Sequence, residues 1–293
     1  MIVGIIGYGE IGSAIHTVLK EKPAVIVRPW DVNTAKYPDQ GTLETVVKEC
    51  DLIFLCTPSW TLRGVLHSVH IHLKEGIPLI ALSKGIEKET CKTTDVLLAE
   101  LVPGHPVGIL AGPMIAEELI EGKHTTGILG SADAEVRKLV AKLFKGTTLH
   151  VRGSADVRGV ALCGVLKNTY VLGLGIADGL ELGVNAKGVL ISRAVKEIRF
   201  IVKYLGGKTA TVLSEAGLGD LFTTGESPHS KNHAVGIAIG KNTIGADLSS
   251  EGTRGISCFE KVLNGQLAHL PFLHYLIKVT AGDIPASEIT KFL

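Results

Sequence analysis

Short apolar runs alternate with helical patterns through the first half of the chain, and this alternation limits the possible folds more than any other sequence feature. The apolar runs are rich in β-branched residues and lack strict apolar–polar alternation, which is typical of strands covered on both faces. They lie at residues 1–6, 24–27, 51–56, 78–83, 106–110 and 125–130. Helical patterns lie between them, at residues 10–20, 59–70, 89–101, 114–121 and 133–144. The alternation predicts an α/β fold with a parallel, doubly wound sheet.

The pattern changes after residues 151–156. From there to residue 293 the sequence shows long helical patterns and few strand candidates. A chain of 293 residues is also longer than one average domain. We therefore expect two domains, a doubly wound domain at residues 1–153 and a mainly α-helical domain at residues 154–293.

Composition and charge exclude several classes of protein. Apolar residues make up 45% of the chain and the net charge is +1, so the chain is not intrinsically disordered. The 30 basic residues are balanced by 29 acidic ones, and neither half has the basic excess of a nucleic-acid-binding surface. We expect no nucleic-acid partner.

Cysteine and histidine spacing gives no sign of a disulfide framework or a metal site. The five cysteines include no C-x-x-C pair, which favours a reducing, cytoplasmic location. The first residues lack the basic and long apolar regions of a signal peptide. The histidines of the segment HSVHIH (67–72) have no acidic or thiol partner at metal-binding spacing, so we expect no metal.

One segment, residues 159–177, is almost wholly apolar over 19 residues. Lys167 and Asn168 lie near its centre, and a lysine at the middle of a bilayer is costly. The segment is therefore predicted to be a buried helix and not a membrane span. Fully buried lysines are rare without a partner or a task, which makes Lys167 a candidate functional residue.

A glycine motif follows the first predicted strand and opens the first predicted helix. This arrangement is typical of a turn that binds the pyrophosphate of a dinucleotide at a helix N-terminus. The motif residues are Gly7, Tyr8, Gly9, Glu10, Ile11 and Gly12. Asp31 lies 19 residues beyond Gly12, where an acidic side chain accepts hydrogen bonds from the ribose hydroxyls and repels a 2′-phosphate. NAD is therefore favoured over NADP, although Arg28 lies nearby.

Glycine is in excess, with 35 residues in the chain. Four glycines fall within residues 4–12, and eight fall within residues 153–188, around Lys167. We expect many of them to let the backbone approach a dinucleotide or to let helices pack closely.

Four further segments carry polar residues that a core does not need. They are Ser83–Glu87 at the end of a predicted strand, Gly112–Glu118, Gly217–Leu221 with Ser230–Asn232, and Leu166–Asn168. Ligands of open α/β sheets gather at the carboxyl ends of the strands. The lysines, amides and carboxylate of these segments are therefore predicted to surround the nucleotide site.

These motifs resemble those of the NAD(P)-dependent glycerol-3-phosphate dehydrogenases along nearly the whole chain. The segments on which the resemblance rests are GYGEIG, SKGIE, AGPMIAEE, the run from DVRGVALCGVLKN to GVNAK, GLGDLFTTGESPHSKN, and Glu251-Gly252. The resemblance implies a Rossmann-type dinucleotide-binding domain, a helical substrate-binding and catalytic domain, and a homodimer. It also implies interconversion of dihydroxyacetone phosphate and sn-glycerol 3-phosphate, as in glycerophospholipid and carbohydrate metabolism.

The resemblance also assigns roles. Lys167 matches the lysine that exchanges a proton with the substrate oxygen, Lys84 and Asn168 would orient the carbonyl, and Asp220 would complete the polar cluster. Substrate would meet Lys84, Gly112, Met114, Lys167, Asp220, Ser230, Lys231 and Asn232. Besides the glycine motif and Asp31, the nucleotide would meet Pro58, Lys84, Ala116, Lys231 and Glu251. Independently, a lysine beside another cation in a dry pocket has a lowered pKa, which suits proton transfer.

Four positions depart from the family pattern. Lys231 stands where an arginine grips the phosphate, Met114 replaces a small polar residue, Ile115 a phenylalanine and Ala161 a glutamate. One alternative is therefore the same hydride chemistry on another small phosphorylated or carboxylated hydroxy compound. A second is an inactive nucleotide-binding sensor, in which Lys84 and Lys231 are solvated lysines and Asp220 caps a helix.

Overall fold

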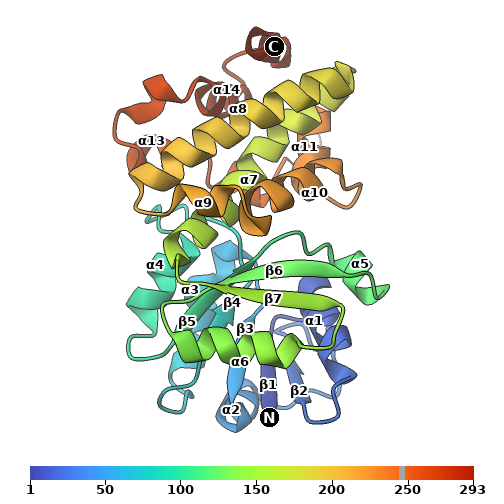
Figure 1. The fold of residues 1–293 in the computed structure, drawn as a ribbon, viewed down its shortest axis with the longest axis vertical. Coiled ribbons are helices and arrows are strands. Elements are labelled where there is room, and N and C mark those ends of the chain that lie inside the picture. The colour runs from blue at the N-terminus through green and yellow to red at the C-terminus, as the bar shows by residue number, and fades with distance from the viewer. Residues whose placement is uncertain (244–247) are drawn as a thin grey trace.

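The computed structural model describes residues 1–243 and 248–293. In Figure 1 the strands and the first six α-helices form the lower part, and helices α7 to α14 form the upper part. The helices of the lower part are α1 Glu10–Lys20, α2 Leu43–Glu49, α3 Leu62–His70, α4 Thr94–Leu101, α5 Ala116–Ile120 and α6 Ala134–Phe144. Those of the upper part are α7 Val157–Gly179, α8 Gly183–Tyr204, α9 Thr209–Val212, α10 Asp220–Glu226, α11 Lys231–Gly240, α12 Glu251–Arg254, α13 Cys258–Val262 and α14 Pro271–Ala281. Short helical turns are η1 Thr34–Lys36, η2 Ser59–Thr61, η3 Glu215–Gly219, η4 Gln266–His269 and η5 Ala286–Phe292.

Within the described residues, seven strands form one sheet in the order β2-β1-β3-β4-β5-β6-β7. The first five strands in this order are parallel, β6 pairs antiparallel with β5, and β7 is parallel to β6. The strands are β1 Ile2–Ile6, β2 Ile26–Trp30, β3 Leu52–Leu55, β4 Leu79–Ala81, β5 Val107–Ala111, β6 Thr125–Gly130 and β7 Leu149–Ser154. The predicted α/β fold with a doubly wound sheet is confirmed.

Four details differ from the sequence-based prediction. The last two strands run opposite to the others, and β7 was not predicted because only alternate residues at its start are buried, with His150 and Arg152 exposed. Helix α2 was not predicted because it has two buried residues, Val46 and Val47, and owes its start to the Thr42 cap. Edge strand β2 begins at Ile26, two residues later than expected.

Helices cover both faces of the sheet. Neighbouring residues of each central strand point to opposite faces, so Phe54 of β3 packs with α1, α5 and α6, whereas Ile53 packs with α2, α3 and α4. The first turns of α7 extend the second layer, because Val160 packs in the same cluster as Ile53. The two apolar layers explain why the strands read as continuous apolar runs.

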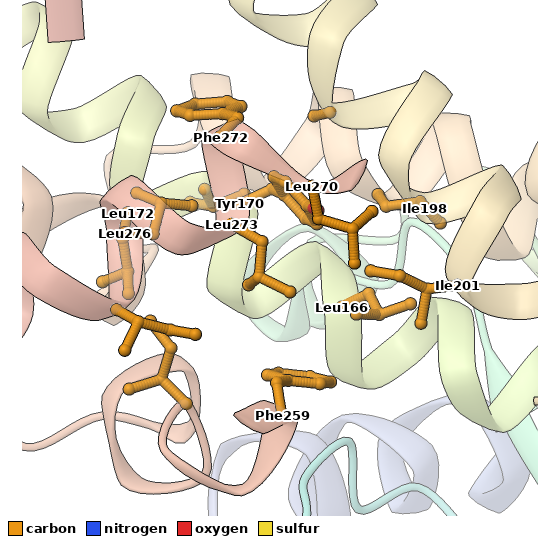
Figure 2. Close-up of a cluster of buried hydrophobic side chains, with 14 of the residues drawn as sticks. Leu166, Tyr170, Leu172, Ile198, Ile201, Phe259, Leu270, Phe272, Leu273 and Leu276 are labelled. Carbon is orange, nitrogen blue, oxygen red and sulfur yellow. The ribbon is translucent and has the colours of Figure 1, made fainter. Parts of the chain in front are cut away.

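Helix α7 is the central helix of the upper part. Its residues 159–177 are all buried, and α8, α13 and α14 pack around it. Figure 2 shows this core, in which Leu166 and Tyr170 of α7 lie among Ile201, Phe259 and Leu273. Helix α7 is the one described helix long and apolar enough to cross a membrane, and its most apolar window is wholly buried inside the protein. The prediction of a buried core helix is confirmed.

Helices α7 and α11 cross at four glycines, spaced i, i+4 on each helix. A Cβ built on Gly175 would lie 2.2 Å from the carbonyl oxygen of His233, and one on Gly236 would lie 2.2 Å from that of Leu172. Gly179 and Gly240 make the same approach one turn later. The predicted role of glycine in close helix packing is confirmed for this pair.

This crossing predicts the effect of adding one methyl group. Gly175→Ala should destabilise the protein by about 1–3 kcal/mol or more, because the new Cβ meets rigid backbone that has to move. Gly188→Ala is the matched control, since Gly188 is an exposed helical glycine with open space around its Cβ position. Alanine should stabilise there by roughly 0.5–1 kcal/mol. Urea unfolding measures both changes, and equal effects would contradict the packing argument.

Candidate active site

A cavity of about 930 Å³ opens at the carboxyl ends of the parallel strands. Its lining includes Ile6 at the end of β1, Cys56 after β3 and Leu82 after β4. Helices α7, α11 and α12 contribute Asn168, Asn232 and Glu251. The predicted site residues that line it are Gly7, Gly9, Glu10, Ile11, Asp31, Pro58, Lys84, Met114, Ala116, Asn168, Asn232 and Glu251. Topology thus places the cavity where open α/β sheets bind ligands.

The glycine motif forms the tight turn between β1 and α1. Gly7 has a φ of +98°, and a Cβ on Gly12 would lie 2.0 Å from the Gly7 carbonyl oxygen. Gly9 caps α1, and a Cβ there would meet open space, so a ligand can approach the helix N-terminus. Thr57 also lines this cavity, and its Oγ1 is the one buried side-chain polar atom of the described residues without a hydrogen-bond partner. The free amides and this hydroxyl fit the phosphates of a dinucleotide.

Asp31 is held at the end of β2. Its Oδ2 accepts from the backbone amide of Tyr8 (2.7 Å) and its Oδ1 from that of Asn33 (2.8 Å). The ammonium of Lys36 lies 3.1 Å from Oδ2. Burial opposes the charged form, but the two amides and Lys36 hold the pKa of Asp31 below its ordinary value. The carboxylate is therefore ionised at neutral pH.

Three charged side chains from distant segments meet beside the cavity. Asp220, at the start of α10, accepts from Lys84 Nζ on Oδ2 (2.7 Å) and pairs with Lys167 Nζ on Oδ1 (3.1 Å). Lys167 also donates to Thr224 Oγ1 (2.7 Å), and Lys84 donates to the Gly112 carbonyl (3.0 Å). The structure therefore brings together Lys84, Lys167 and Asp220, which the sequence placed in three separate motifs.

Burial sets the protonation behaviour of this cluster. Burial, with a smaller contribution from the positive charge of Lys84, lowers the pKa of Lys167 to about 8, although Asp220 opposes the shift. Burial alone would raise the pKa of Asp220, but Lys167 and Lys84 lower it below its ordinary value. Lys167 can therefore gain or lose a proton near neutral pH while Asp220 stays ionised.

A series of amide hydrogen bonds fixes Asn168, the residue after Lys167 on α7. Asn168 Nδ2 donates to the Lys84 carbonyl (2.8 Å), and its Oδ1 accepts from Asn232 Nδ2 (2.9 Å). Asn232 Oδ1 accepts in turn from the Gly252 amide (2.9 Å). These bonds join the segment that carries Lys84 to α7, α11 and α12.

Two contacts connect the loop after β3 with α12. Glu251 accepts from the amide of Ser59 (3.0 Å) and from its hydroxyl (2.5 Å), and the Arg254 guanidinium lies 4.3 Å from the centre of the Trp60 ring. Burial raises the pKa of Glu251, and the Ser59 bonds oppose that rise. Because Trp60 and Glu251 line the cavity, these contacts close one side of it.

The remaining predicted residues lie at different depths. Met114 and Ile115 line the cavity, so two of the four departures face its interior. Ala161 packs in the apolar layer against the sheet and is not among the lining residues. Ser230 caps α11 by accepting from the His233 amide, and Lys231 is exposed at the first position of that helix.

Sequence reasoning missed several residues of the site. Thr224 binds Lys167, and its only signal is its position one turn after Asp220 within the quoted motif GLGDLFTTG. Ser59 and Trp60 were missed because their partners lie 192 and 194 positions away in the sequence. Across residues 1–243 and 248–293, no group of three or more His, Cys, Asp or Glu side chains is placed to hold a metal ion.

Comparison with known proteins agrees with the predicted resemblance. A family model described as the C-terminus of NAD-dependent glycerol-3-phosphate dehydrogenase matches residues 156–291, and the model of its N-terminus matches residues 36–137. A glycerol-3-phosphate dehydrogenase (NAD(P)+) of Sphingopyxis alaskensis is 29% identical and aligns over 99% of this chain and 95% of its own. One from Pseudomonas fluorescens is 34% identical over 82% of this chain and 76% of its own.

A solved structure shares the fold. The glycerol-3-phosphate dehydrogenase of Coxiella burnetii superposes with a TM-score of 0.86 and 24% identity, covering 99% of this chain and 97% of that one. The two family models match residues 36–137 of the sheet part and residues 156–291 of the helical part, and the Pseudomonas fluorescens relative is 34% identical over 82% of the chain. The chain therefore belongs to the NAD-dependent glycerol-3-phosphate dehydrogenase family.

Proposed function

We propose that this chain transfers hydride between NAD(H) and dihydroxyacetone phosphate or sn-glycerol 3-phosphate, with Lys167 as the proton donor and acceptor. The observation that carries the proposal is the buried Lys167 between Asp220 and Lys84, beside a cavity that fits a dinucleotide. Membership of the dehydrogenase family supports the same reaction.

The nucleotide supplies the hydride acceptor or donor of the reaction. The residues that would hold it are the glycine motif Gly7–Gly12, Asp31, Pro58, Lys84, Ala116, Lys231 and Glu251. Of these, Tyr8 acts through its amide on Asp31, and Gly12 acts by letting α1 pack on the turn. Asp31 favours NAD, because its negative charge opposes a 2′-phosphate.

The chain's own residues manage the proton and the substrate carbonyl. In reduction, the Lys167 ammonium donates a proton to the carbonyl oxygen, and in oxidation the neutral amine takes it from the hydroxyl. Lys84 and Asn168 orient that oxygen, and Asp220 fixes both lysines. General acid–base assistance of this kind contributes roughly a hundred- to ten-thousand-fold in rate.

The substrate phosphate would bind at the start of α11. Ser230 caps this ten-residue helix, whose N-terminal amides and positive dipole end favour an anion. Lys231 supplies a cation and Asn232 an amide, whereas Gly112 and Met114 would border the carbon chain. A lysine lacks the two-pronged hydrogen bonding of an arginine, so orientation of the phosphate would be looser.

The same proposal covers organisation and location. Residues 1–153 would form the dinucleotide-binding domain and residues 154–293 the helical catalytic domain, with support from the end of β7 at Ser154 and the start of α7 at Val157. We extend the proposal to a homodimer in the cytoplasm that serves glycerophospholipid and carbohydrate metabolism. Gel filtration with light scattering tests the dimer.

A second candidate function is the same reaction on another substrate, because the apolar residues Met114 and Ile115 line the cavity. The same hydride chemistry would then act on a different phosphorylated or carboxylated hydroxy compound. A substrate panel read by NADH absorbance separates the two. Binding of NADH with no turnover on any compound would instead support the inactive sensor.

The first prediction concerns proton transfer. NADH oxidation with dihydroxyacetone phosphate should be measurable for the native chain, and Lys167→Met should reduce kcat at least about a hundredfold through loss of the general acid. NADH affinity should stay nearly unchanged, because Lys167 lies beyond the residues that line the nucleotide cavity. Lys203→Met, at an exposed position of α8, is the control. Full turnover by Lys167→Met would remove this residue from the mechanism.

A second prediction follows from the pKa of Lys167. For reduction, kcat/KM should fall as pH rises through about 8, because the protonated lysine is the donor. For oxidation, kcat/KM should rise over the same range, because the neutral amine accepts the proton. Lys84→Met should move both transitions to higher pH, and Asp220→Asn should move them to lower pH. Unmoved profiles would exclude Lys167 as the titrating group.

A third prediction tests the phosphate site. Lys231→Ala should raise the KM for dihydroxyacetone phosphate about tenfold or more with little change in kcat, because a charge-assisted contact made throughout the reaction is lost. Lys231→Arg should keep or lower the KM. Lys241→Ala, at the other end of α11, is the control. An unchanged KM for Lys231→Ala would place the phosphate elsewhere.

A further inference from the structure

We propose that Lys36 is a specificity-determining residue that lets this site accept the 2′-phosphate of NADP(H) alongside NAD(H), by exchanging its ion pair with Asp31 for one with the phosphate. The inference rests on the nucleotide site proposed above and assigns a task to a residue outside the glycine motif. It follows from the contacts of Asp31, the position of Lys36 and the anchoring of the turn between them.

The Asp31 carboxylate is already occupied. Two backbone amides and the Lys36 ammonium donate to it, and its side chain is 7% exposed. It can therefore offer only a small part of its surface to the ribose hydroxyls. Because Asp31 keeps both amides when Lys36 leaves, the carboxylate does not depend on the lysine to stay ionised and in place.

Lys36 is the charged group that the cavity presents beside Asp31. It lines the cavity with Asp31 and Val32, and its side chain is 44% exposed. An ion pair this accessible to water contributes little, so the ammonium can leave Asp31 at small cost. A phosphate dianion offers it a stronger, charge-assisted hydrogen bond.

The backbone under Lys36 is fixed, so only the side chain has to move. Asn33 caps the turn η1 by accepting from the Ala35 amide (3.1 Å). The Tyr37 ring packs at 5.1 Å from the Tyr8 ring and 6.0 Å from the His16 ring, measured between centres. These contacts hold the lysine at the edge of the cavity beside the glycine turn.

The other cation near Asp31 in sequence does not share this position. Arg28 lies 3.4 Å from Glu49, and it is not among the residues that line the cavity. Arg28 therefore serves as a control, since it carries the same charge and lies in β2, three residues before Asp31. Asp31 remains negative in both bound states, so NADH should still bind more tightly than NADPH.

Nucleotide binding tests the proposal without turnover. The chain has two tryptophans, Trp30 and Trp60, and both line the cavity, so quenching of their fluorescence reports binding. Lys36→Met should weaken NADPH binding about tenfold or more and leave NADH binding within about twofold. Lys36→Arg should retain NADPH binding, and Arg28→Met should change neither affinity.

Several results would overturn the proposal. They are failure of the native chain to bind NADPH, an unchanged NADPH affinity in Lys36→Met, equal losses for both nucleotides, or the same selective loss in Arg28→Met. Circular dichroism shows whether a variant that loses both nucleotides is folded. Equal losses in a folded variant overturn the proposal, and if Lys36→Met is misfolded, Lys36→Gln replaces it in the same comparison. The native chain could bind both nucleotides, and Lys36→Met could selectively weaken NADPH binding, while no substrate is turned over. That result would reject the proposed function and leave the role of Lys36 intact.

Discussion

The close crossing of α7 and α11 is the contact on which the site depends. Four glycines remove the side chains between the helices, so backbone meets backbone along the crossing. Helix α7 carries Lys167 and Asn168, and α11 carries Asn232, whose amide bonds to Asn168 at 2.9 Å. A wider crossing would break this bond and separate the proposed proton-transfer residues from the proposed phosphate-binding end of α11.

Burial and unequal charge make the cluster chemically useful. Two ammonium groups share one carboxylate, so Lys167 is held without being fully stabilised in its charged form. Its pKa of about 8 results from burial and Lys84 acting against Asp220. A second aspartate would remove this balance by raising the pKa, and an apolar neighbour in place of Asp220 would leave two buried cations in repulsion.

Sequence reasoning predicted the features whose cause is local. The glycine turn, the buried character of α7 and the doubly wound sheet follow from residue type and spacing over a few positions. Thr224 and Ser59 were missed because their roles come from partners brought close by the fold. The reversed direction of β6 and β7 was missed because a strand has the same pattern in either direction. For Asp31, spacing indicated a ribose contact but not its three internal donors.

The connection between the sheet and the helical part has a mechanical consequence. Asp156, just before α7, accepts from the amides of Gly159 and Lys208 and from the hydroxyl of Thr211, and Val160 on the next turn packs against the sheet. A hinge needs a connector free to rotate, and this connector is anchored on both sides. Rigid-body opening about it is therefore disfavoured. The contacts of Ser59 and Trp60 with α12 join a three-residue turn to a four-residue helix, so a local movement there would widen the cavity with less disruption than a rigid-body opening.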